Sequence, residues 1–146
     1  MENNQLAIDI IKKFEGFRST PYLCPAGKYT IGYGFTDDIE PNSYMTEIEA
    51  EKKLNIILNA LRSLILDLIK IEINNNQLNA LLSFVFNLGI GTFKKSSVLT
   101  KINKKDFKGA ARTMLLYNRA NGEVLLGLSK RRNAEKELFL KPIKGK

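Results

Sequence analysis

The chain has 146 residues, of which 44% are hydrophobic and 26% charged, a composition typical of an ordinary globular domain. It contains no histidine and a single cysteine, Cys24. This excludes histidine-dependent nucleophile pairs, histidine metal ligands, cysteine-based zinc cages and an intrachain disulfide.

The net charge and the distribution of apolar residues narrow the classes of partner. Lys and Arg total 23 against 15 acidic residues, which gives a formal charge of +8. Nucleic acid, an anionic membrane face and an anionic polymer would each be attracted by such a charge. No apolar run approaches the roughly 18 to 20 residues of a membrane span, and the polar N-terminus has no secretory signal. We therefore expect no stable insertion into a membrane.

The first third of the chain predicts a helix followed by a β-hairpin. Apolar side chains follow one helical stripe over residues 4–14, with Asn3 or Asn4 as cap and Gly16 as the end. Residues 17–36 are rich in Pro and Gly around two strand-prone stretches, so they predict a hairpin with its turn at residues 25–27. Residues 37–45 are expected to form a loop or a short third strand.

From residue 46 onward the pattern is helical. Thr46 and Glu49 have the spacing of a capping box, and Gly89 has the position of a helix end. Asp106 and Ser129 are expected to cap later helices, and residues 121–122 to form a turn. The predicted helices are 47–70, 76–88, 96–103, 106–118 and 129–139. The overall class is α+β, with a small β element near the N-terminus.

Glu15, Cys24 and Thr30 form a candidate catalytic set. Glu15 lies at a predicted helix end, and the other two flank the hairpin turn. Partial burial of a carboxyl group favours its protonated form, which is the form that donates a proton. A thiol and a hydroxyl opposite are suited to hold or activate a water molecule. The spacing alone also fits a solvated surface glutamate.

The segments around this set resemble the active-site region of phage-type lysozymes, the endolysins of glycoside hydrolase family 24. They are residues 14–18, 21–27 and 29–36. In that family a Glu, an Asp or Cys nine residues later, and a Thr six residues further form the catalytic set, and Glu15, Cys24 and Thr30 match this spacing. Residues 77–93, 117–124 and 127–135 resemble the central helix and the C-terminal segment of the family.

The resemblance implies a fold and a cleft. We expect a single lysozyme-like catalytic domain over residues 1–146, with a small β-hairpin lobe over about 15–46. A larger helical lobe, about 47–140 plus the N-terminal helix, would face it across the active-site cleft. Four residues are implied in substrate binding: Gly34 and Thr36 on the cleft rim, Phe86 stacking on a sugar, and Asn87 bonding a hydroxyl or N-acetyl group. Phe86 is also an ordinary candidate for the core.

The resemblance further implies hydrolysis of the β-1,4 bond between N-acetylmuramic acid and N-acetylglucosamine in peptidoglycan. Glu15 would be the general acid, with Cys24 and Thr30 holding the attacking water or Cys24 attacking directly. Arg131 or Arg132 is expected near Glu15. No metal or cofactor is implied. The protein is expected to be a monomer, held in the host cytoplasm until a separate pore protein, a holin, releases it to the periplasm and cell wall.

Two other classes of function remain open on the sequence. One is a catalytically inactive peptidoglycan-binding or effector module with the same fold. The other is a basic nucleic-acid-binding helical domain, which the absence of interleaved aromatics and of a recognition helix disfavours. The basic residues that bear on both are Lys94, Lys95, Lys101, Lys104, Lys105, Lys108 and residues 130–132. They are interpreted either as solvated helix faces or as a surface for anionic polymer.

Overall fold

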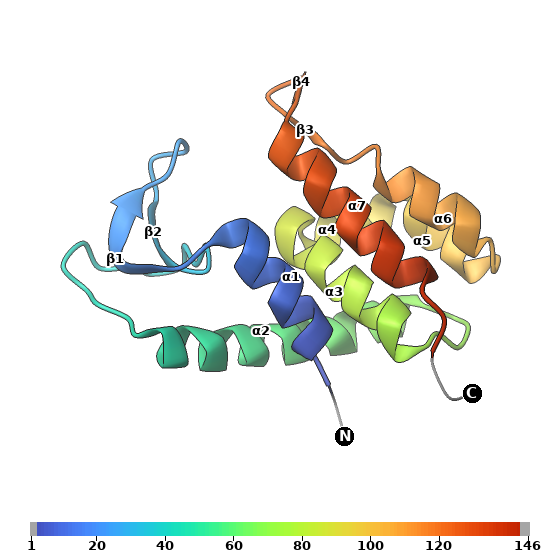
Figure 1. Cartoon of the computed structure of the whole chain (residues 1–146), viewed down its shortest axis with the longest axis horizontal. Coiled ribbons are helices and arrows are strands. Elements are labelled where there is room, and N and C mark those ends of the chain that lie inside the picture. The colour runs from blue at the N-terminus through green and yellow to red at the C-terminus, as the bar shows by residue number, and fades with distance from the viewer. Residues whose placement is uncertain (1–2, 144–146) are drawn as a thin grey trace.

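The computed structural model describes residues 3–143 and has the expected α+β architecture, with a small hairpin and a larger set of helices. A small hairpin lobe stands at one end of a long helix, α2 (Glu47–Leu68), and the other helices gather toward its far end (Figure 1). Helix α2 therefore connects the hairpin lobe to the helical lobe.

The N-terminal helix α1 (Gln5–Glu15) ends where the sequence predicted. Gly16 has φ = +71° and its amide donates to the Lys12 carbonyl, which closes the last turn. Of the two asparagines that were expected to cap the helix, Asn3 makes the bond. The Asn3 side chain accepts a hydrogen bond from the Gln5 amide at 2.9 Å, whereas the Asn4 side chain makes no capping bond. Asn4 instead hydrogen-bonds to side chains of α2, and so ties the start of α1 to that helix.

The predicted hairpin is present as antiparallel strands β1 (Arg18–Leu23) and β2 (Tyr29–Gly32). The turn closes through hydrogen bonds between the backbones of Cys24, Gly27 and Lys28. Residues 37–45 form a loop and not a third strand. This loop returns to the hairpin at its end, where the Met45 amide donates to the Ser19 carbonyl at 2.9 Å.

Both long helices begin at capping boxes. The Thr46 hydroxyl accepts from the Glu49 amide, and the Glu49 carboxylate accepts from the Thr46 amide, as predicted. Helix α3 (Asn75–Leu88) has the same arrangement with Asn74 and Gln77, which the sequence indicated only as a break before a helix.

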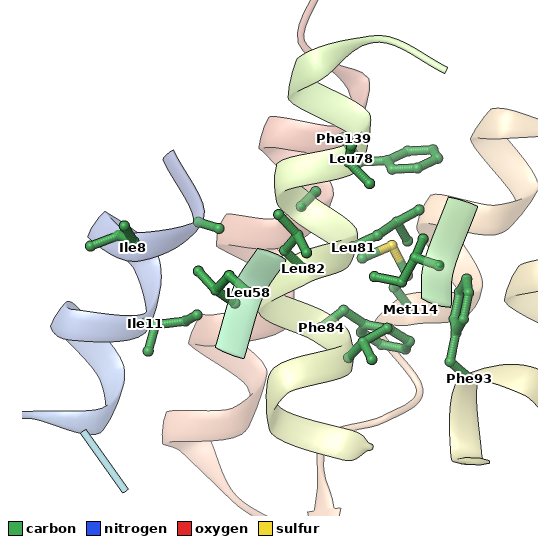
Figure 2. Close-up of a cluster of buried hydrophobic side chains, with 14 of the residues drawn as sticks. Ile8, Ile11, Leu58, Leu78, Leu81, Leu82, Phe84, Phe93, Met114 and Phe139 are labelled. Carbon is green, nitrogen blue, oxygen red and sulfur yellow. The ribbon is translucent and has the colours of Figure 1, made fainter. Parts of the chain in front are cut away.

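Helix α3 forms the centre of the helical lobe and is buried over most of its length. Apolar side chains from five other helices converge on it, as Figure 2 shows. Those labelled there are Ile8 and Ile11 of α1, Leu58 of α2, Leu78, Leu81, Leu82 and Phe84 of α3, Phe93 of α4 (Ile90–Lys95), Met114 of α6 (Phe107–Met114) and Phe139 of α7 (Leu126–Leu140). Because α3 is held on all sides, the residues at its C-terminal end have a fixed position.

The C-terminal half differs from the sequence prediction in several helix boundaries. Helix α4 was not predicted, and α6 ends at residue 114 instead of 118. Helix α5 (Ser97–Asn103) and the cap of α6 by Asp106 are confirmed. A short antiparallel pair, β3 (Arg119–Ala120) and β4 (Glu123–Val124), surrounds the predicted turn at residues 121–122.

Helix α7 begins three residues before the predicted start, so the assignment of Ser129 as its cap is wrong. The Ser129 amide donates to the Leu125 carbonyl inside the helix, and its hydroxyl accepts from the Asn118 side chain. The helix starts without any side-chain cap, which removes the local signal for its boundary. In the part of the chain that the structure describes, no helix is long and apolar enough to cross a membrane.

Candidate active site

A cleft of about 380 Å³ lies where the hairpin lobe meets the helical lobe. Its walls come from the end of α1, the segment after β2, the middle of α2 and the end of α3. The lining residues are Glu15, Gly34, Phe35, Thr36, Asp37, Lys53, Ile57, Leu61, Val85, Phe86, Asn87 and Gly89. Five residues singled out from the sequence, Glu15, Gly34, Thr36, Phe86 and Asn87, are thus brought together around one cavity.

The contribution of α2 to the cleft was missed by the sequence analysis. Lys53, Ile57 and Leu61 are spaced four residues apart on one helical face and line the cavity. Ile57 and Leu61 also pack against the core. From the sequence alone, their spacing is therefore indistinguishable from that of residues that pack only in the core. The Lys53 ammonium lies 5.0 Å from the centre of the Phe35 ring, a cation–π contact on the cleft wall.

Glu15 is the last residue of α1 and its side chain is 24% exposed, so it reaches the cleft while remaining partly buried. Arg131 of α7 donates from Nη1 to Oε2 of Glu15 at 2.8 Å. The expectation that one of two neighbouring arginines lies near Glu15 is confirmed, and the arginine is Arg131. A charge-assisted bond of this length fixes the position of the carboxyl group.

Arg131 belongs to a buried network between α3 and α7. Its Nε donates to Oε2 of Glu135 at 3.2 Å, and Nη2 donates to the Ser83 carbonyl at 3.2 Å. The Ser83 hydroxyl donates to the same Glu135 oxygen at 2.6 Å. Arg132 pairs with the other oxygen of Glu135 at 3.0 Å and donates from Nη2 to Oδ1 of Asn87 at 2.6 Å.

This network corrects the interpretation of residues 130–132 as one basic surface. The Arg131 and Arg132 side chains are 3% and 0% exposed, and Glu135 is 0% exposed. Burial raises the pKa of the Glu135 carboxyl, and the two guanidinium groups and the Ser83 hydroxyl oppose that effect. Burial also lowers the pKa of the Arg132 guanidinium. Only Lys130 of this basic run is exposed.

Cys24 and Thr30 lie together on the hairpin, but neither is among the residues that line the cleft. Thr30 is buried and donates from its hydroxyl to the Lys28 carbonyl at 3.2 Å. A backbone hydrogen bond at Lys28 is the main cause that lowers the pKa of the Cys24 thiol, and the Thr30 side chain contributes in the same direction. The hairpin thus holds a thiol with increased acidity beside a hydroxyl.

The other lysines that the sequence analysis grouped as a basic surface are not among the residues that line the cleft. Lys94, Lys95, Lys104, Lys105 and Lys108 are exposed on or beside α4, α5 and α6. Lys101, by contrast, is partly buried and donates to the Thr113 hydroxyl at 2.7 Å. Five of the predicted lysines therefore remain available as a charged surface, whereas Lys101 is held by Thr113.

Comparison with known proteins gives one consistent family. The sequence model described as Phage lysozyme matches residues 12–135. The endolysin of Acyrthosiphon pisum secondary endosymbiont phage 1 is 36% identical over 95% of this chain and 98% of its own length. The endolysin of Bacillus phage B103 is 38% identical over 96% of this chain, which spans 54% of the length of that relative.

Solved structures agree with the sequence relatives. The muramidase domain of SpmX from Asticaccaulis excentricus superposes with a TM-score of 0.86 at 35% identity, covering 93% of this chain and 95% of that one. A mutant of P22 lysozyme superposes with a TM-score of 0.84 at 32% identity, covering 97% and 99% of the two chains. The similarity therefore extends over both the hairpin lobe and the helices.

Proposed function

The chain belongs to the phage lysozyme family, and we propose that it hydrolyses the β-1,4 bond between N-acetylmuramic acid and N-acetylglucosamine in bacterial peptidoglycan. Membership of this family, with endolysins among its relatives, places the protein among glycosidase-type enzymes that act on the cell wall. The finer assignment, namely the bond cleaved and the residue roles, is supported by the geometry around Glu15.

The observation that carries the proposal is the position of Glu15 at the cleft, where Oε2 is bound by Arg131 and Oε1 has no hydrogen bond to residues 3–143. Arg131 binds Oε2, so we assign the transferable proton to Oε1. That oxygen faces Gly34, where the absence of a side chain leaves room for a glycosidic oxygen to approach. Proton transfer from Glu15 to that oxygen assists departure of the leaving sugar.

We assign four further cleft residues to substrate binding. Phe86 is half-buried, so one part of its side chain packs on the core while the rest lines the cleft. An aromatic side chain in that position is suited to stack on a sugar ring. Thr36 and Asn87 offer polar groups that hydrogen-bond hydroxyl or N-acetyl groups, and Gly34 forms the rim. A mostly apolar cleft with a few polar groups is typical of a binding site for a small organic group.

Cys24 and Thr30 are assigned to the attacking water. Cys24 lies outside the set of residues that line the cleft with Glu15, which favours a water molecule between thiol and sugar over direct attack by sulfur. A single displacement by water inverts the configuration at the anomeric carbon. Direct attack by sulfur would form a glycosyl-enzyme, and its hydrolysis would give overall retention of the anomeric configuration. We therefore propose inversion.

We also propose that the protein acts as a monomer on the wall. In this account it collects in the cytoplasm of the host and reaches the periplasm and wall when a separately encoded holin opens the membrane. The exposed lysines on α4 to α6 would then favour contact with anionic wall polymer.

The test of the proposed reaction is identification of the products from purified peptidoglycan by mass spectrometry. Hydrolysis of the glycosidic bond gives fragments with a reducing N-acetylmuramic acid end. Products lighter by one water, with an anhydro end, would assign a transglycosylase and contradict the proposal. Release of free stem peptides would assign an amidase. Binding to the wall without any product would assign an inactive module.

A further inference from the structure

The amide of Asn87 has only one possible orientation in this structure. Nη2 of Arg132 lies 2.6 Å from Oδ1 of Asn87. A guanidinium group has donors and no acceptor, so the amide oxygen must face Arg132 and the NH₂ group must point away from it. Among residues 3–143 this NH₂ group has no hydrogen-bond partner, and Asn87 lines the cleft. The cleft therefore presents an unused donor.

Arg132 is itself fixed by burial and by a carboxylate. Its side chain is 0% exposed and lies 5.0 Å over the Phe84 ring. Its Nε is 3.0 Å from Oε1 of Glu135. A buried guanidinium without its carboxylate would be strongly disfavoured, so Glu135 determines where Arg132, and hence the Asn87 amide, can lie.

The second oxygen of Glu135 serves the other side of the site. Oε2 accepts from Ser83 at 2.6 Å and from Nε of Arg131 at 3.2 Å, and Nη1 of Arg131 then donates to Glu15 at 2.8 Å. Each oxygen of Glu135 thus pairs with one arginine, Oε2 with Arg131 through a hydrogen bond and Oε1 with Arg132 through an ion pair without hydrogen-bond geometry. Each arginine in turn binds one cleft residue.

We infer that Glu135 is a positioning residue shared by the two functions of the cleft, proton donation by Glu15 and substrate recognition by Asn87. The group that Asn87 recognises is a hydrogen-bond acceptor, such as the carbonyl oxygen of an N-acetyl substituent, because its amide oxygen is already occupied. The inference rests on the proposed function and extends it to residues that touch no substrate.

The network has two branches, one from Glu135 through Arg132 to Asn87 and one from Glu135 through Arg131 to Glu15. Steady-state kinetics on soluble peptidoglycan strands separates their effects. Arg132→Lys and Asn87→Asp are expected to raise KM by about fivefold, the loss of one hydrogen bond, with little change in kcat. Asn87→Asp is the sharper of the two, because a carboxylate still pairs with Arg132 but has no proton to donate. Arg131→Lys is expected to lower kcat by at least about tenfold, because only this branch reaches the catalytic acid.

Glu135→Gln is the central variant and is expected to change both constants, KM by about fivefold and kcat by about tenfold. Should this variant not fold, Glu135→Asp keeps the charge, withdraws the carboxylate by one methylene group and is expected to change both constants in the same directions. Asn79→Ala is the matched control. Asn79 is also buried on α3, but it ties the N-terminal segment to that helix through Ala7 and Asn3. It is expected to lower stability while leaving kcat and KM unchanged.

The inference is overturned if the folded Glu135 variant behaves like Asn79→Ala, with wild-type kcat and KM, or if Asn87→Asp retains the wild-type KM. Its failure is distinct from failure of the proposed function. If only the inference fails, Glu15→Gln still abolishes hydrolysis. If the proposed function fails, the wild-type protein gives no glycosidic product.

Discussion

A Cβ atom built on Gly34 would lie 2.8 Å from Oε1 of Glu15, closer than such atoms are found in proteins. The same glycine has φ = +84°, a conformation that residues with side chains rarely adopt. The backbone at Gly34 therefore lies so close to Glu15 that a side chain there would force a displacement. Only glycine leaves the space beside Oε1 open to a substrate.

Gly34→Ala is expected to lower lytic activity by at least about tenfold, because the methyl group displaces the carboxyl from its productive position. The unfavourable φ is expected to reduce the free energy of unfolding by about 1–2 kcal/mol. Wall clearing and thermal unfolding measure the two effects.

Gly122→Ala is the control for backbone strain. Gly122 has φ = +80° in the turn between β3 and β4, but a Cβ there meets nothing within 4 Å. It is expected to lose similar stability and to keep its activity. Equal loss of activity in the two variants would show that strain, and not contact with Glu15, is responsible.

The burial of Tyr33 predicts that the free energy of unfolding falls at alkaline pH. Its ring is buried and its hydroxyl donates to Oε2 of Glu47 at 2.8 Å. Burial is the main cause that raises the pKa of Tyr33, and Glu47 adds to it. The folded state thus retains the phenolic proton above pH 10, where the unfolded chain releases it, so the contribution of Tyr33 is full below about pH 10 and falls above it.

Denaturant unfolding of wild type and Tyr33→Phe at several pH values tests this directly. At pH 8 the wild type is expected to be more stable by about 1 kcal/mol, the hydrogen bond lost in the variant. That difference should shrink as the pH rises through the range above 10. A difference that stays constant with pH would contradict the assignment, since titration of the lysines is common to both proteins.

Local signals explain which parts of the fold were predictable. The signal for the start of α2 is a capping box contained in four residues, Thr46 to Glu49, and the signal for the end of α1 is a single residue, Gly16. The start of α7 was misplaced because Leu125 offers no capping side chain. Helix α4 was missed because its six residues are too few to show a hydrophobic period.

The candidate site was predictable only where a local motif marked it. Glu15, Gly34 and Arg131 all lie within segments that resemble the family, so an arginine near Glu15 was expected although Arg131 is 116 residues away in the sequence. The role of Glu135 was not predicted. Arg131, Arg132 and Glu135 have the i, i+4 and i, i+3 spacing of an exposed helical ion pair. Nothing in that spacing distinguishes a solvated face from a buried network, which depends on the packing of α7 against α3.

Cys24 is expected to tolerate some replacements and not others. If it holds the attacking water, Cys24→Asp should keep activity because a carboxylate accepts a proton from water, and Cys24→Ala should lose most of it. Cys24→Ser should fall between the two. If the thiol is a nucleophile, the serine variant should be nearly inactive and a glycosyl-enzyme should be trapped. NMR of the freshly cleaved sugar decides, since retention of configuration would contradict the single displacement proposed here.

Lysis is expected to weaken as salt is added. Attraction between exposed lysines and anionic wall polymer is screened over about 8 Å at about 0.15 M ionic strength. Replacing Lys104, Lys105 and Lys108 together by Gln should reduce both the low-salt activity and its dependence on salt, since all three are exposed outside the cleft. If wild-type activity is equal at low salt and at roughly 0.3 M, these lysines form only a solvated face.

The most direct measurement is wall clearing by wild type against Glu15→Gln, with Glu137→Gln as a control for the same change at an exposed site on α7. Gln keeps the shape of the side chain but cannot donate the proton, and general acid catalysis contributes roughly 10²–10⁴-fold. We predict that Glu15→Gln folds normally, binds peptidoglycan and does not clear it, while Glu137→Gln clears it at the wild-type rate. Retention of more than about a tenth of wild-type activity by Glu15→Gln would contradict the role of Glu15 as the catalytic acid.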